Sequence, residues 1–109
     1  MGANKEAYSP VQFGGSDYET VAASQTAQVL GTAGSVGDFI GRLIISVNTV
    51  ATATVTLLDN ATSIPILTGA ATLVPGVIVV EIGARSVSGA WKITTGAGAT
   101  VLAVGKFSV

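Results

Sequence analysis

Residues 39–58 of this 109-residue chain, FIGRLIISVNTVATATVTLL, decide its fold. Apolar side chains alternate with polar or smaller ones in both halves of the stretch. The expected buried faces are Leu43, Ile45 and Val47 in the first half, and Ala51, Ala53, Val55 and Leu57 in the second. Because successive side chains of a strand point to opposite faces, this period of two predicts two half-buried strands.

Short apolar or alternating segments of the same kind continue on both sides of this stretch. Further strands are predicted over 20–30, 63–67, 77–82, 90–95 and 100–109, with Gly- or Pro-containing turns between most of them. Residues 20–30 are also rich in alanine, which leaves a helix as the alternative there. About seven or eight short strands at regular spacing predict an all-β fold. We expect an antiparallel β-sandwich of jelly-roll or immunoglobulin-like kind, with a small barrel as the alternative.

Two of these segments contain residues that indicate where the strand lies in its sheet. Pro65 lies in the 63–67 segment and cannot donate to a strand ladder, which indicates an edge strand or a linker. The 77–82 segment is apolar on both faces apart from Glu81, which predicts burial on both sides, inside the sandwich or beneath a neighbouring subunit. A buried, unpaired carboxylate costs several kcal/mol, so Glu81 is either exposed near the strand end or paired with Arg85, Arg42 or a partner's charge.

The N-terminal residues differ from the rest of the chain. Residues 1–18 hold three of the five Phe and Tyr residues, at Tyr8, Phe13 and Tyr18, together with the Gly14-Gly15 pair. This composition predicts an extended arm over 1–18, followed by the β-sandwich domain over 19–109. The alternative is a frayed terminus, which is common at exposed chain ends.

Composition argues for a protein partner. Only 10% of the residues are charged, whereas an ordinary globular domain has roughly 25%. A small domain exposes much of its surface, so another protein surface is expected to cover part of it. The five cationic residues are scattered and the formal net charge is −1, which gives no basic patch for nucleic acid. No uninterrupted apolar run approaches about 18 residues, so no membrane span is predicted.

The sequence contains few side chains that could act in catalysis or bind a metal ion. It contains neither histidine nor cysteine, which removes the commonest general base and nucleophile-base pairs. The six carboxylates lie mostly at expected strand ends or in the arm, so the chain is predicted not to be an enzyme and to hold no metal or cofactor. A cleft lined by two or more of them would favour the opposite. Asp59-Asn60 predicts a turn.

Two further features have structural and functional interpretations. Trp91, the single tryptophan, is expected to anchor the core, with a platform for a sugar or peptide as the alternative. Gly31, Gly34 and Gly37, and likewise Gly96 and Gly98, resemble fragments of phosphate-binding loops. Both glycine patterns are interpreted as turns and close-packed backbone.

In texture, residues 19–109 resemble the small, cysteine-free capsid cement, or decoration, proteins of tailed bacteriophages. The resemblance rests on the abundance of Thr, Ala, Val and Gly and on the segments 55–60, VTLLDN, and 88–96, SGAWKITTG. It implies a dimer or trimer on the outside of the virion that bridges neighbouring major capsid proteins after assembly in the host cytoplasm. Many such proteins also extend the contact with an N-terminal arm.

Candidate partner-binding residues follow from the arm and from the unusual carboxylate: Tyr8, Phe13, Tyr18 and Glu81. A receptor- or carbohydrate-binding β-module of a phage fibre or adhesin is the alternative function. It predicts an exposed aromatic patch at Trp91 or Tyr18.

Overall fold

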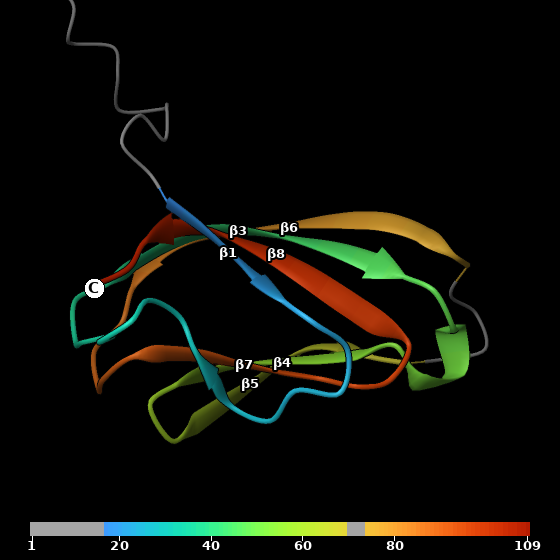
Figure 1. Cartoon of the computed structure of the whole chain (residues 1–109), viewed down its shortest axis with the longest axis horizontal. Helices are drawn as coiled ribbons and strands as arrows, with labels where there is room; N and C mark the ends of the chain where they lie inside the picture. The colour runs from blue at the N-terminus through green and yellow to red at the C-terminus, as the bar shows by residue number, and fades with distance from the viewer. Residues whose placement is uncertain (1–16, 70–73) are drawn as a thin grey trace, which may run out of the picture.

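A computed structural model describes residues 17–69 and 74–109. These residues form two antiparallel sheets of four strands each, packed one over the other (Figure 1). The strands are β1 (Asp17–Val21), β2 (Gln28–Val29), β3 (Phe39–Val47), β4 (Thr54–Asp59), β5 (Thr62–Thr68), β6 (Gly76–Arg85), β7 (Trp91–Thr95) and β8 (Ala99–Lys106), with one short 3-10 turn, η2 (Val50–Thr52). The predicted antiparallel β-sandwich is confirmed.

The order of the strands identifies the kind of sandwich. Sheet A has the order β1-β8-β3-β6 and sheet B the order β2-β7-β4-β5. The first strand therefore pairs with the eighth, the second with the seventh, the third with the sixth and the fourth with the fifth. This nested pairing is that of a long hairpin rolled into two sheets, which is the jelly roll of the two sandwich types expected.

The core lies between the inner faces of the two sheets, and residues 39–58 supply much of it. Leu43 and Ile45 of β3 are completely buried, as is Val55 of β4, and Leu57 is buried beside it. Their neighbours along each strand face outward, so the predicted period of two is confirmed over β3 and β4. Ala51 is the exception: it lies in η2 and is exposed, because the chain makes a 3-10 turn before β4 begins.

The prediction of a single strand, or a helix, over 20–30 is wrong. The segment contains the end of β1 and all of β2, and these strands belong to different sheets. Ser24 and Ala27 both have positive φ, at 61° and 48°, which turns the chain from sheet A to sheet B. Neither residue type favours that conformation, so the sequence gives no local signal for the turn.

The strands that contain Pro65 and Glu81 both lie at sheet edges. β5, which contains Pro65, is the outer strand of sheet B, so the predicted edge strand is confirmed. β6 is the outer strand of sheet A, and Val77 and Val79 are 66% and 52% exposed. Burial of 77–82 on both sides within the sandwich is therefore wrong, because Val77 and Val79 point to the outer face of sheet A, which no other described element covers. Burial beneath another subunit stays a prediction.

The turn and glycine predictions are confirmed where the structure describes them. Asn60 has φ 58° in the turn between β4 and β5. Gly31, Gly34 and Gly37 all have positive φ. At Gly98 an added Cβ would collide with the main-chain oxygen of Thr49, so only glycine lets these two backbone segments approach so closely.

Candidate protein-binding surface

The outer faces of the two sheets differ in character. The outward residues of β4 and β7 in sheet B are mostly threonine and lysine: Thr54, Thr56, Leu58, Lys92 and Thr94. The outward residues of sheet A, which we call the sheet A face, include six apolar or aromatic side chains among eleven, whereas the edge strands of sheet B add Val29 and Pro65 to its outer face. The sheet A face consists of Tyr18, Thr20, Arg42, Ile44, Ser46, Val77, Val79, Glu81, Thr100, Leu102 and Val104. Apolar surface gathered on one face is typical of a protein-binding site.

Two of the four predicted site residues lie on this face. Tyr18 is opposite Val104, Val104 is opposite Arg42, and Arg42 is opposite Glu81. These pairings form one row across all four strands of sheet A, with Tyr18 and Glu81 at its two ends. Tyr18 is 71% exposed. Neighbouring strands lie about 4.8 Å apart, so the row is about 14 Å long.

The other two predicted site residues, Tyr8 and Phe13, lie outside the described residues. The arm predicted over 1–18 ends within β1, because Asp17 and Tyr18 already pair with β8. The arm itself stays a prediction. β1, which Figure 1 shows at the edge of sheet A beside β8, begins one residue before Tyr18.

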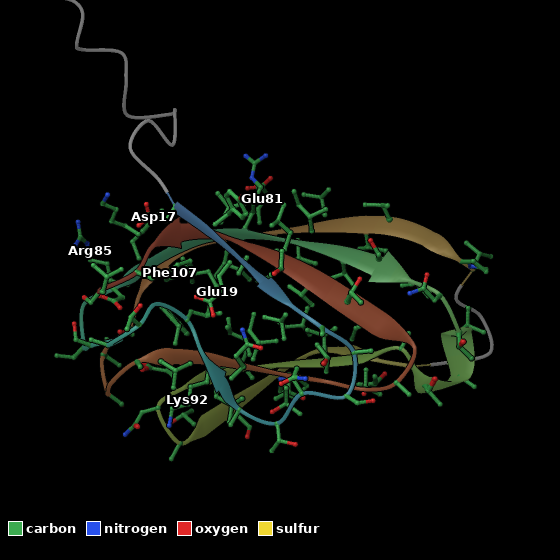
Figure 2. All side chains as sticks on the ribbon, viewed as in Figure 1. Asp17, Glu19, Glu81, Arg85, Lys92 and Phe107 are labelled. Atoms are coloured by element: carbon green, nitrogen blue, oxygen red, sulfur yellow. The ribbon has the colours of Figure 1, made fainter. Side chains whose placement is uncertain are left out.

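Glu81 is both exposed and paired. Its Oε2 lies 3.5 Å from Nη2 of Arg42, and its side chain is 62% exposed. Figure 2 shows Glu81 pointing away from sheet B, into solvent above sheet A. The prediction of exposure or local pairing is therefore confirmed. An exposed ion pair of this kind contributes about 0–1 kcal/mol to stability, so this carboxylate is not needed to hold the fold.

The next row holds residues that the sequence analysis did not single out. Leu102 is opposite both Thr20 and Ile44, and Ile44 is opposite Val79. A shallow hollow of about 380 Å³ lies over this row; it is lined by Thr20, Val21, Ala22, Ile44, Ser46, Thr100, Val101 and Leu102. One feature of the sequence could have indicated this row. β3 and β8 carry apolar residues at outward as well as inward positions, whereas the outward positions of β4 are mostly threonine.

A second, larger hollow lies at the end of the sandwich where β1 starts. It has a volume of about 500 Å³, and its lining includes Asp17, Glu19 and Asp38. Three of the six carboxylates therefore share one open hollow, which is the feature named above as favouring an enzyme. Their contacts decide what they can do.

Each of these carboxylates is already engaged. Glu19 accepts hydrogen bonds from Gln28 Nε2 at 2.8 Å and from the Gly31 amide at 2.7 Å, which joins β1 to the loop after β2. Asp17 lies 3.9 Å from Nζ of Lys106. These contacts join the strand ends of β1 to the loop after β2 and to β8.

Asp38 is the most strongly held of the three. Its carboxylate accepts hydrogen bonds from the Ser108 hydroxyl at 2.6 Å, from the Ser108 amide at 3.0 Å and from the Ser35 amide at 3.0 Å. Burial raises the pKa of Asp38, but the hydrogen bonds from Ser108 and Ser35 outweigh it, so the pKa lies below the ordinary value of 3.8. The group is ionised at neutral pH, and it fixes the C-terminal residues to the loop before β3.

Trp91 is a core anchor, as expected from its sequence context. The side chain is 3% exposed and lies at the start of β7. Its Nε1 donates a hydrogen bond of 2.8 Å to the main-chain oxygen of Asp38. An indole held in this way presents no face to a ligand, so the platform interpretation is wrong.

Within residues 17–69 and 74–109, no three His, Cys, Asp or Glu side chains gather where a metal ion could be held. In the same ranges, no helix is long and apolar enough to cross a membrane.

No protein-family model, curated protein or solved structure matches this chain.

Proposed function

We propose that this protein is a capsid cement protein of a tailed bacteriophage, and that the sheet A face binds the outer surface of the major capsid protein lattice. The observation that supports this best is the contrast between the two outer faces. Six of the eleven residues on the sheet A face are apolar or aromatic, whereas threonine and Lys92 make up most of the outward residues of β4 and β7 in sheet B. The resemblance in sequence texture supplies the identity of the partner.

The row from Tyr18 to Glu81 gives such a face its specificity. Burying Ile44, Leu102 and Val104 supplies apolar contact, at roughly 25 cal/mol for each Å² removed from water. Tyr18 adds a large side chain at one edge, and the Arg42–Glu81 pair adds charge at the other. Tyrosine and arginine are enriched among residues that dominate binding energy, whereas the surrounding threonines contribute mainly complementarity.

Stabilisation of the head would follow from mass action. A protein that binds only the expanded lattice lowers the free energy of that state by an amount that grows with its concentration relative to its Kd. Repeated sites around the shell add avidity when one oligomer reaches two capsid subunits. Heads lacking the protein are therefore expected to release DNA at a lower temperature. Equal heat stability with and without the protein would contradict the proposal.

Two matched substitutions test the surface itself. Leu102→Asp places a charge in the middle of the sheet A face, and Thr56→Asp places the same charge on the outer face of sheet B. Both proteins are added to expanded heads that were assembled without the cement protein, and binding is measured by co-sedimentation. We expect Leu102→Asp to weaken binding by about tenfold or more, since burying an unpaired charge is costly. Thr56→Asp should bind as the unchanged protein does.

A receptor- or carbohydrate-binding module is the second candidate. The observation that favours it is Tyr18, an exposed aromatic ring that also lines the larger hollow beside Asp17 and Glu19. Buried Trp91 counts against it, and jelly rolls serve both capsid proteins and lectins. Binding to immobilised glycans that Tyr18→Ala abolishes, together with no binding to heads, would favour this function over the first.

A further inference from the structure

The four edges of this sandwich are not alike. Sheet edges expose unpaired backbone groups, and proteins usually protect them with short strands, charges or proline. β1 has five residues and carries Asp17 and Glu19, β2 has two residues, and β5 contains Pro65. β6 has ten residues and no proline within it. Of the four, β6 is the longest, and its two charges, Glu81 and Arg85, are of opposite sign, so they can pair with those of a second copy.

We propose that β6 pairs antiparallel with β6 of a second copy of this chain, about a two-fold axis through Gly83. The argument for a second copy is the position of the two charges. Glu81 and Arg85 both point outward and lie at equal distances in sequence on either side of Gly83. In a two-fold antiparallel pairing centred on Gly83, Glu81 of each copy is opposite Arg85 of the other, which gives two favourable cross-strand pairs.

The same register also matches the apolar residues. β6 ends at Arg85, so the paired stretch runs from Glu81 to Arg85 in each copy. Facing inward, Ile82 comes opposite Ala84, and both already pack against the core at this open edge of the sandwich. The register thus joins charge to opposite charge and apolar to apolar.

Gly83 suits the centre of such a pairing. It has φ 65°, and the register between β6 and β3 shifts around it, so β6 carries a bulge there. A two-fold axis at this position sets the two bulges against each other, so neither copy has an extra residue relative to its partner. An added Cβ at Gly83 would meet nothing within 4 Å, so this position lies at the open surface of the chain.

Pairing of this kind would enlarge the sheet A face. Antiparallel strands related by a two-fold axis keep the same side of the sheet, so the apolar faces of both copies would form one surface. Four strands and about five residues along each span a flat area of about 300 Å². A standard interface needs roughly 800 Å² of accessible surface from each partner. Two joined faces come closer to that size, and in this respect the inference deepens the proposed function and rests on it.

Charge reversal tests the register. In Arg85→Glu, each Glu81 would face a glutamate instead of an arginine, and the dimer Kd measured by sedimentation equilibrium is expected to rise by about tenfold or more. Lys92→Glu is the matched control, because it changes the net charge equally on the outer face of sheet B (Figure 2). An equal rise in Kd for both variants would contradict the charge pairing. A protein that stays monomeric at about 100 μM, before any substitution, would overturn the proposal.

Cross-linking checks the same register independently. The chain has no cysteine, so Gly83→Cys introduces a single thiol that would lie opposite its own copy, within the Cα separation that a disulfide allows. Val79→Cys would lie eight positions from its copy along the paired strands, about 27 Å away. Oxidation should cross-link the first variant and not the second; the reverse result would refute the register.

Failure of this inference and failure of the proposed function can be told apart. A monomeric protein that still binds phage heads would refute pairing through β6 and leave the cement function standing. A dimer that cross-links through Gly83→Cys but does not bind heads would do the opposite.

Discussion

The indole of Trp91 and the backbone of Asp38 are joined by a buried hydrogen bond of 2.8 Å, from Nε1 to the main-chain oxygen. The same oxygen accepts a bond from the Ser86 amide at 2.9 Å. With the Asp38 carboxylate bound to Ser35 and Ser108, one residue fastens β7, the loop after β6 and the C-terminal residues. Loss of any of these bonds should therefore reduce the stability of the whole sandwich.

Trp91→Phe is expected to lower the free energy of unfolding by about 1–3 kcal/mol, because it removes a buried donor and leaves space where the indole was. Urea denaturation followed by circular dichroism measures this. Tyr18→Phe is the matched control, since Tyr18 is exposed and its loss of a hydroxyl should change stability by less than about 0.5 kcal/mol. Equal effects of the two substitutions would mean that the indole hydrogen bond contributes nothing.

Asp38→Asn should destabilise the protein in a pH-dependent way. The folded pKa of Asp38 lies below 3.8, so its stabilisation is fully present above that value and is lost as the pH falls through the folded pKa. We expect a loss of about 1–3 kcal/mol at pH 7 and a smaller difference from the unchanged protein below pH 3.8. Ser108→Ala, which removes the 2.6 Å bond, should raise the pKa of Asp38 toward its ordinary value, as NMR titration can show.

Asp59→Ala tests a contact between distant parts of the chain. The Asp59 carboxylate is buried at the end of β4 and accepts bonds from the amides of Val87 at 2.9 Å and Ser88 at 3.1 Å. Removing it breaks both hydrogen bonds, which should cost about 1–3 kcal/mol in thermal or urea unfolding. Asn60→Ala, one residue later and exposed, should cost less, although its φ of 58° adds about 1 kcal/mol.

Gly98→Ala is expected to be among the more damaging small substitutions. The new Cβ would collide with the Thr49 oxygen and the Thr52 hydroxyl, both in the segment between β3 and β4. Overpacking of this kind costs roughly 1–3 kcal/mol. Ala97→Gly, at the exposed neighbouring position, should change the melting temperature by much less. A stable Gly98→Ala protein would mean that this loop moves aside at little cost.

Much of the fold could be predicted because alternation is a local property. The buried set of β3, β4 and β7, including Leu43, Leu57 and Ile93, follows directly from the period of two. The edge position of β5 could also be predicted, since Pro65 cannot donate a ladder hydrogen bond. The division of residues 20–30 between two sheets could not, because Ser24 and Ala27 are held in unusual conformations by the surrounding structure rather than by their own preference.

The candidate site was harder to predict because it depends on which strands become neighbours. Tyr18 and Glu81 are 63 residues apart in sequence, and the pairing of β1, β8, β3 and β6 alone places them in one row. The apolar run of 77–82 predicted burial on both faces, which is wrong for Val77 and Val79. Which face of a strand is covered depends on how the two sheets pack, and the local sequence does not encode that packing.

The nested strand order also constrains how the chain can fold. The turn at Asn60 closes the β4–β5 hairpin over a few residues, whereas the β1–β8 pairing joins Asp17 to Gly105, 88 positions later (Figure 1). Closing a longer loop costs more entropy, and folds dominated by distant contacts form slowly, in milliseconds to seconds. Assembly should therefore begin at β4–β5 and proceed outward. Tyr18 can pair with β8 only after β8 has left the ribosome. The sheet A face is therefore expected to be the last part of the molecule to fold.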